Sequence, residues 1–228
     1  MSSMGMPAND PRTEPFGYNC NRCRRCCYHD GIGLNPYEVA RLARNRGVST
    51  REFRAAFTDD DKGLILARTE GGACVFLGSE GCTVYRDRPL ACRLYPLGRN
   101  FNADGTEYFF HVERHPQSRG ELTRSRTIAH FLETQNAQPF IKAADDYYHW
   151  FCAASACSDT TDHGEAVNAS TADAEGAHDL LDMDVAVAGH CTANGIEEPT
   201  DIEERRQMHL TILYQQLAGI VTESRQRT

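Results

Sequence analysis

The chain has 228 residues, of which 40% are hydrophobic and 9% aromatic, a composition that excludes a wholly disordered protein. No apolar run reaches the length of a membrane span and the first fifteen residues lack a secretory pattern, so we expect a cytoplasmic protein with no membrane partner. The net charge of −8 is segregated, since 13 of the 32 acidic residues and none of the 24 basic residues lie between residues 152 and 204, which argues against nucleic acid as a partner.

The first part of the chain is predicted to alternate loops with short helices. Residues 1–17 are small, polar and proline-containing, and we expect them to be disordered. The run 20–27 has no apolar period and is expected to be a loop. An asparagine cap followed by Pro36 predicts a helix that ends at Gly47. A Ser-Thr-Arg-Glu capping box begins a second helix at residues 49–52.

Short strands and turns are predicted to follow. Two stretches that flank a glycine turn, 64–67 and 73–77, predict a hairpin. Residues 82–85 predict a further short strand, and Pro89 opens a short helix. A second hairpin is predicted around the turn at residues 103–105.

The rest of the chain is predicted to be mainly helical. Apolar stripes indicate helices over residues 122–135, from Pro139 to Phe151 and from Asp201 to Thr222. The elements together predict an α+β fold with a small cysteine-rich metal-binding core, short β-hairpins, surrounding helices and a C-terminal helix. We divide the chain into a disordered N-terminus (1–17), a cysteine-cluster metal-binding domain (18–157), an acidic low-complexity insertion (158–179) and a C-terminal segment (180–228).

Seven cysteines in the first half of the chain form the candidate site. Four lie in the run Cys20-Asn-Arg-Cys23-Arg-Arg-Cys26-Cys27. In a reducing compartment, closely spaced cysteines indicate metal ligands or redox thiols before disulfides. The Cys-x-x-Cys steps let neighbouring thiolates reach one metal or cluster, and more distant cysteines supply the remaining ligands. The pool of metal and cofactor ligands is Cys20, Cys23, Cys26, Cys27, Cys74, Cys82 and Cys92.

Seven thiols exceed the four that one zinc ion or one [4Fe–4S] cluster needs. Three arrangements remain open: one four-thiolate site with three spare thiols, two sites that share the seven, or one site plus a redox pair. Because Cys26 and Cys27 are adjacent, one can bind metal while its neighbour packs or reacts. The arginines inside the first run and around Cys92 either stabilise the negative charge of the thiolates or form a solvated surface. His29 could complete a mixed site.

The order of the cysteine blocks resembles the YkgJ-type cysteine-cluster family. The resemblance covers about residues 18–115 and rests on the run from Cys20 to Cys27, on Cys74-Val-Phe-Leu77, on the block from Cys82 to Pro89 and on Cys92-Arg93-Leu-Tyr-Pro96. It implies a domain that chelates zinc or iron. Many members also have a cysteine soon after the last block, whereas residues 115–120 here have none, which leaves His111 or His115 to replace it.

A more distant resemblance is to the bacterial flagellin lysine N-methylase, which shares the double cysteine and the Cys-x-Phe-Leu block. It implies an iron–sulfur cluster and methyl transfer from S-adenosylmethionine. The first cysteines of that enzyme are spaced more widely than Cys20 and Cys23 are here.

Three functions follow from these patterns. The first is a protein with a thiolate-ligated iron–sulfur cluster, or zinc, in a redox or site-supporting role; thiolate-only ligands near arginines favour iron. The second is a protein-lysine N-methyltransferase that uses S-adenosylmethionine. The third is a structural zinc module that presents a surface to a protein partner. The sequence leaves open whether the protein is an enzyme, and it does not name the protein partner or protein substrate.

Overall fold

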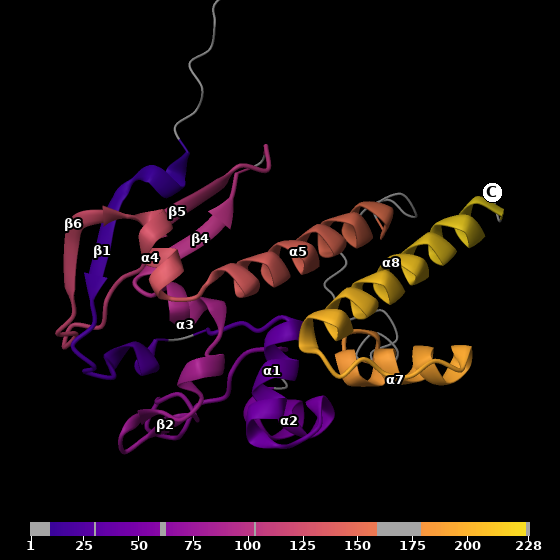
Figure 1. Ribbon diagram of the computed structural model, residues 1–228, viewed down its shortest axis with the longest axis horizontal. Helices are drawn as coiled ribbons and strands as arrows, with labels where there is room; N and C mark the ends of the chain where they lie inside the picture. Colours follow the sequence, from indigo (N-terminus) through magenta and orange to yellow (C-terminus); the bar gives the residue numbers. More distant parts are fainter. Residues whose placement is uncertain (1–9, 30, 60–62, 103, 159–178, 227–228) are drawn as a thin grey trace, which may run out of the picture. The chain divides into compact units, whose positions relative to one another are not determined.

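The computed structural model describes residues 10–29, 31–59, 63–102, 104–158 and 179–226 (Figure 1). These residues form an α+β fold, as the sequence predicts, in which helices are joined to pairs of short antiparallel strands. The chain divides into two compact units, each made of two separate stretches of sequence. Unit 1 comprises Met1–Ile32 and Ala67–Pro139, and unit 2 comprises Gly33–Leu66 and Phe140–Thr228.

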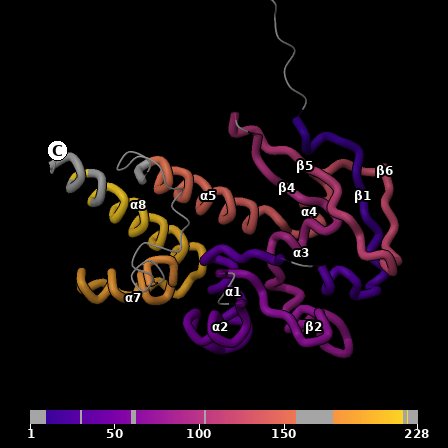
Figure 2. Tube along the Cα trace, turned by 180° about the vertical axis from the view of Figure 1, so that it is seen from behind, coloured from indigo at the N-terminus to yellow at the C-terminus, as the bar shows by residue number. Residues whose placement is uncertain are grey.

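Unit 1 is built on two-stranded antiparallel sheets. β1 (Pro15–Asn19) pairs with β6 (Glu121–Thr127), β2 (Leu77–Gly78) with β3 (Gly81–Cys82), and β4 (Leu97–Phe101) with β5 (Glu107–His111). Its helical elements are the 3-10 turns η1 (Pro11–Thr13), η2 (Arg25–Tyr28) and η4 (Tyr85–Asp87) and the helices α3 (Leu90–Leu94) and α4 (Ile128–Thr134). The β2–β3 hairpin and the β4–β5 hairpin lie at opposite ends of the unit (Figures 1 and 2).

The core of unit 1 includes the contact between β1 and α4. Phe16 of β1 is 3% exposed and packs edge-on against Phe131 of α4, with ring centroids 4.9 Å apart. Ile128 and Leu132 of α4 are buried as well. Because burial of a phenylalanine side chain contributes about 1.5–3 kcal/mol, this cluster fixes β1, and with it the start of the cysteine run, within the unit.

Unit 2 is mainly helical over its described residues. It contains α1 (Pro36–Arg46), α2 (Thr50–Phe57), all but the first two residues of α5 (Gln138–Ser158), α7 (Met183–Asn194) and α8 (Ile202–Gln226). Capping boxes begin α1 and α2, as predicted, since Asn35 accepts the N–H of Glu38 and Ser49 accepts the N–H of Glu52. Gly47, in the left-handed conformation, ends α1.

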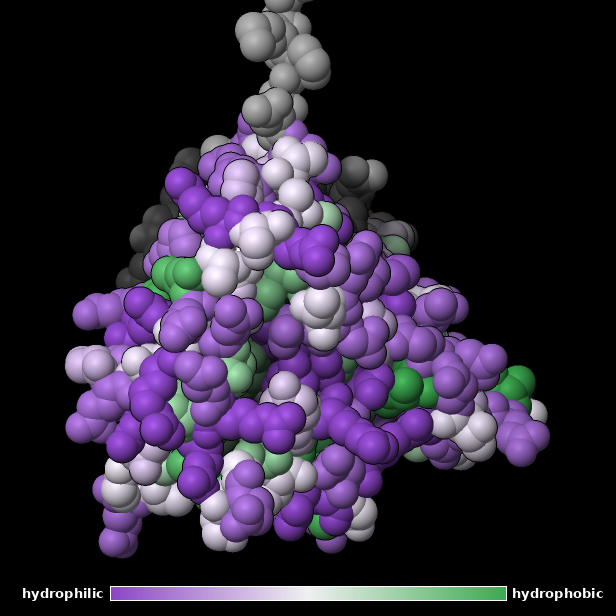
Figure 3. All heavy atoms as spheres, turned by 60° about the vertical axis from the view of Figure 1, so that its left-hand side comes forward, coloured by the Kyte–Doolittle hydropathy of each residue, from purple (hydrophilic) through white to green (hydrophobic). Residues whose placement is uncertain are grey.

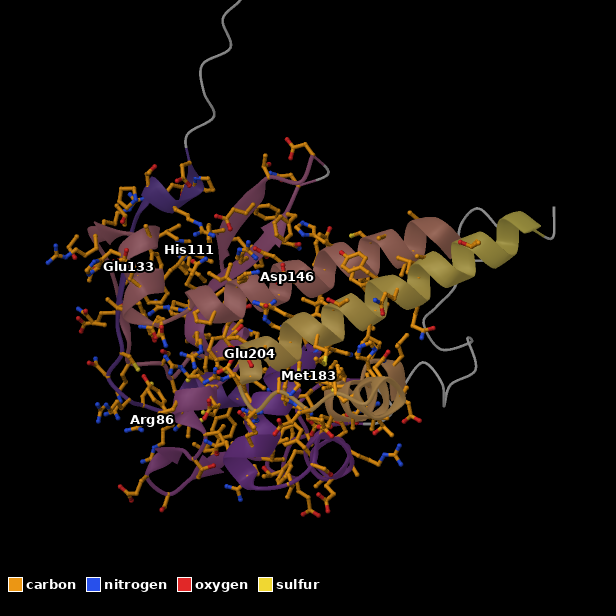
Figure 4. All side chains as sticks on the ribbon, turned by 45° about the vertical axis from the view of Figure 1, so that its right-hand side comes forward. Arg86, His111, Glu133, Asp146, Met183 and Glu204 are labelled. Atoms are coloured by element: carbon orange, nitrogen blue, oxygen red, sulfur yellow. The ribbon has the colours of Figure 1, made fainter. Side chains whose placement is uncertain are left out.

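A buried polar network joins the helices of unit 2. Arg206 of α8 is 1% exposed; it pairs with Asp146 of α5, labelled in Figure 4, and with Glu203 at 3.0 Å. His209 is fully buried, and its Nε2 donates to a backbone carbonyl oxygen at 2.8 Å, so that its Nδ1 accepts from the Tyr147 hydroxyl at 2.9 Å. Burial lowers the pKa of His209, which keeps the ring neutral near pH 7.

Two predicted elements are wrong because of a long-range strand pairing. Residues 11–17, predicted to be disordered, form η1 and the first part of β1. Residues 122–127, predicted to begin a helix, belong to β6, and α4 begins only at Ile128. β1 and β6 stabilise each other, and a partner so distant along the chain leaves no local signal in either stretch.

The predicted hairpin of residues 64–67 and 73–77 is present only next to its turn. Arg68 and Cys74 form an isolated antiparallel bridge, the Thr69 N–H donates to the Ala73 carbonyl oxygen (2.8 Å), and the Val75 N–H donates to the Ala67 carbonyl oxygen (3.3 Å). Farther from the turn the partners change, because Ile65 bridges with Gly33 and Leu66 with Thr58. The glycine turn therefore decides the pairing of the residues beside it but not that of residues 64–66.

Most of the remaining predicted elements are present. The short strand predicted at residues 82–85 is an exception, since only Cys82 lies in a strand (β3) and Tyr85 begins η4. The helix after Pro89, the hairpin of β4 and β5, the long helix from residue 138 and the C-terminal helix are confirmed. Residues 1–9 and nearly all of the predicted acidic insertion, 159–178, lie outside the described residues. Among the helices that are described, none has the length and apolar character needed to span a bilayer. The face seen in Figure 3 is mainly hydrophilic, with apolar side chains in small separate patches.

Candidate metal centre

The first cysteine run leaves β1 and turns through η2. Arg22 and Arg24 have φ values of 49° and 64°, in the left-handed region that non-glycine residues rarely adopt, and they bend the loop. Cys26 and Cys27 lie on η2, whereas Cys20 is exposed directly after β1.

Backbone hydrogen bonds bring Cys27, Cys74 and Cys82 into one region. The Cys74 N–H donates to the Cys27 carbonyl oxygen (2.8 Å), which also accepts from the Arg68 guanidinium (3.2 Å). The Cys74 carbonyl oxygen accepts the N–H of Leu77 (2.9 Å), and Leu77 pairs with Cys82 across β2 and β3. Main-chain hydrogen bonds therefore join these distant segments.

The thiols of Cys26, Cys27, Cys74 and Cys82 act on one another. A hydrogen bond from the Cys27 S–H to the Cys26 sulfur lowers the pKa of Cys26 to about 7 and raises the pKa of Cys27. Burial raises the pKa of the Cys74 and Cys82 thiols, and the charge of Cys26 raises both further. None of the four is in a disulfide bond. The four sulfurs, called here the inner thiols, are thus one group of soft donors.

The inner thiols meet the chemical requirement of a metal centre more closely than its geometric one. Within the described residues, no group of three or more His, Cys, Asp or Glu side chains is arranged to hold a metal ion. The Cys27 thiol, whose pKa is raised by its hydrogen bond to Cys26, holds a proton near pH 7. Metal binding would require loss of that proton and rotation of side chains about their Cα–Cβ bonds. A set of soft thiolate donors fits zinc or an iron–sulfur cluster.

Cys23 is a fifth thiol beside this group. The Arg119 N–H donates to its sulfur at 3.4 Å. Burial raises the pKa of Cys23, but hydrogen bonds from the N–H groups of Arg119 and Arg25 outweigh that effect, and the pKa is lowered. The charge of Cys26 also acts on Cys23. Of the other predicted ligands, Cys20 is exposed and Cys92 is half-buried on α3.

Two arginines act on the inner thiols through their charge. Arg88, only 9% exposed, favours the thiolate forms of Cys26 and Cys82. Arg68 has the same effect on Cys74. These guanidinium groups would offset part of the negative charge that several thiolates bring to a metal.

Arg93 has a different role, because it holds the backbone of the cysteine domain. It is 3% exposed and donates to the carbonyl oxygens of Arg88 (3.0 Å), Gln135 (2.8 Å) and Arg86. Three carbonyl acceptors around one buried guanidinium tie η4 and α3 to the end of α4. The alternative in which the arginines form a solvated surface therefore does not hold for Arg88 and Arg93.

The histidines weighed as replacement ligands have other contacts. His111 is exposed on β5, packs against Phe16 at 5.8 Å between ring centroids, and lines a separate cavity of about 330 Å³. Figure 4 shows it well apart from Arg86, which belongs to η4. His115 accepts the Gln117 N–H at its Nδ1 (3.1 Å), which places the proton of a neutral ring on Nε2. His29 packs against an aromatic ring, with the centroids 6.1 Å apart.

Comparison with known proteins identifies the domain that carries these thiols. Residues 19–113 match the family described as "CxxCxxCC: Putative zinc- or iron-chelating domain". The cysteine domain is similar to this family over those residues and is called here the CxxCxxCC domain. The YkgJ-type resemblance is thereby confirmed, and the match supports metal binding of the zinc- or iron-chelating kind.

The CxxCxxCC domain also has a curated relative. The chain is 31% identical over 84 residues to an uncharacterized protein of Methanocaldococcus jannaschii. The match covers 36% of this chain and 45% of that protein, so the chain spans less than half the length of its relative. No solved structure matches the chain significantly.

Sequence reasoning missed several residues that interact with the cysteine segments of the CxxCxxCC domain. Tyr18, Arg68 and Ser118 lie outside every cysteine block, and spacing rules give them no weight. The one available signal was the stretch 115–120, which was singled out because it lacks a cysteine. The structure places that stretch beside Cys23.

Proposed function

We propose that the CxxCxxCC domain carries a thiolate-ligated [4Fe–4S] cluster, held by cysteines drawn from Cys23 and the four inner thiols. The observation that carries this proposal is the mutual influence of the inner thiols at one place, where the backbone bond from Cys74 to Cys27 joins their segments. Cys20 and Cys92 are not among the ligands that we propose. When bound, such a cluster supplies one-electron transfer at a potential set by charge, hydrogen bonds and exposure.

The charge around the thiols supports iron–sulfur ligation over zinc. Four thiolates serve either metal, so the number of thiols does not separate the two. Two guanidinium groups, of Arg68 and Arg88, favour the thiolate forms and would offset the charge of a reduced cluster. The protein would then serve in electron transfer, in redox sensing or in support of a site on a protein partner or protein substrate, in the cytoplasm.

The test is a metal analysis of protein purified without oxygen. A brown protein with a broad band near ~400 nm and matched iron and sulfide supports the cluster. Cys74→Ser and Cys82→Ser should each abolish that band, whereas Cys152→Ser, which changes an exposed cysteine of unit 2, should leave it intact. Stoichiometric zinc with no iron in the wild-type protein would instead establish a structural module that unfolds when the zinc is chelated.

The methyltransferase alternative differs by its need for S-adenosylmethionine. Titration calorimetry of the metal-loaded chain with S-adenosylmethionine separates the two functions. Heat of binding would favour methyl transfer to a protein lysine, and its absence would leave the electron-transfer or supporting role.

A further inference from the structure

The segment 115–120 lies against the first cysteine run. The pairing of Asn19 with Glu121 places the residues that follow β1 beside the residues that precede β6. The Asn21 side-chain amide donates to the Arg119 carbonyl oxygen (2.6 Å), and the Arg119 N–H donates to the Cys23 sulfur (3.4 Å). The two strands thus bring a distant segment to one thiol of the candidate centre.

The Ser118 side chain lies among several polar groups at this contact. Its hydroxyl oxygen lies 3.4 Å from the Tyr18 hydroxyl oxygen, and its side chain helps to lower the pKa of Cys23. Ser118 acts in the same direction on the Tyr95 hydroxyl, which accepts the His115 N–H at 3.3 Å. A half-buried hydroxyl among these polar groups has little freedom to rotate, and the Arg119 N–H beside it donates to the Cys23 sulfur at 3.4 Å, so the two together restrict that side chain.

The packing of Tyr18 against Gly120 fixes the position of the tyrosine hydroxyl. A Cβ added at Gly120 would lie 1.9 Å from the Tyr18 hydroxyl oxygen, so the tyrosine ring lies directly over the glycine backbone. The Arg114 guanidinium donates to the Gly120 carbonyl oxygen at 2.7 Å. The position of the Tyr18 hydroxyl, and through it that of Ser118, follows from the strand pairing.

We propose that Ser118, together with the Arg119 N–H, is a positioning residue that holds the Cys23 sulfur as a ligand of the centre. This rests on the proposed function. Cys26 and Cys27 are adjacent in the chain and share a hydrogen bond, so the set would use Cys23 with one of that pair, Cys74 and Cys82. Groups that hydrogen-bond to a metal ligand fix its direction, and their loss weakens metal affinity by about 10- to 100-fold.

The first measurement tests the contact in metal-free protein. Ser118→Cys is treated with a mild oxidant, digested and analysed by mass spectrometry, with Ser125→Cys, an exposed position on β6, as the matched control. We expect a disulfide between Cys23 and the thiol introduced at position 118, and none between Cys23 and the thiol introduced at position 125. Equal cross-linking in both variants, or none to Cys23 in either, would overturn the contact.

The second measurement tests the positioning role with Co²⁺ as the probe. Ser118→Ala should weaken Co²⁺ binding about tenfold or more and reduce the sulfur-to-cobalt absorption, while Ser118→Thr, which keeps the hydroxyl, restores both. Ser125→Ala should match the wild type. Unchanged binding and absorption in Ser118→Ala would refute the positioning role. Failure of the wild-type protein to bind Co²⁺, zinc or iron would refute the proposed function instead, and the cross-linking result would still report on the contact.

Discussion

Metal binding to the cysteine domain should release protons, and the structure sets a minimum number. Three of the five thiols nearest the centre, those of Cys27, Cys74 and Cys82, have a raised pKa and hold their protons at pH 7. Any four ligands drawn from the five thiols omit only one, so at least two of these protonated thiols must lose a proton to the solvent. Protons compete with the metal for these thiols, and raising the pH weakens that competition, so metal affinity should increase with pH.

Two protons correspond to a gain of about 100-fold in affinity for each pH unit, or about 2.7 kcal/mol at 1.36 kcal/mol per proton and unit. Zn²⁺ affinity is measured between pH 6.5 and 8 by competition with a chromophoric chelator whose own protonation is known. Proton release is followed with an indicator dye in weak buffer. Cys152→Ser serves as the control and should keep the wild-type slope. A slope below tenfold per pH unit would refute the assignment of these thiols as ligands.

Three further predictions concern the units that carry the site. Arg93→Met should lower the free energy of unfolding by about 3 kcal/mol, because three buried or partly buried carbonyl oxygens lose this donor, and urea titration measures the loss. Gly120→Ala should destabilise the protein by about 1–3 kcal/mol, because its Cβ meets Tyr18, whereas Gly219→Ala, in open space on α8, should not; a neutral Gly120→Ala would contradict the packing. The pKa of His209 is lowered in the folded protein, so the contribution of this residue to the unfolding free energy is complete above pH 6.5 and is lost as the pH falls below that value. In His209→Gln this pH-dependent part of the unfolding free energy should disappear.

Local signals in the sequence were sufficient where the structure depends on local contacts. The caps Asn35 and Ser49 hydrogen-bond within their own first turns, so the beginnings of α1 and α2 can be predicted from four residues each. The helix after Pro89 is local in the same sense. By contrast, β1 and β6 each depend on a partner far along the chain, and prediction failed for both.

The candidate site likewise has one part that local spacing predicts and another that depends on long-range contacts. Cysteine spacing was sufficient to predict the metal-binding character of the domain, and it proposed seven candidate thiols. It could not separate the inner thiols from Cys20 and Cys92, because that distinction depends on the backbone bond between Cys27 and Cys74 and on the burial of individual sulfurs. Nor could spacing indicate Ser118, which approaches Cys23 only through the pairing of β1 with β6.

The pairing of Asn19 with Glu121 also has a consequence for how the protein is made. A ribosome delivers a chain from its N-terminus, so the first cysteine run emerges well before the strand that anchors it. Until β6 has been synthesised, Cys20 to Cys27 belong to a stretch whose strand partner does not yet exist. We therefore expect metal delivery to follow completion of β6, and the nascent thiols to depend on the reducing capacity of the cell during that interval.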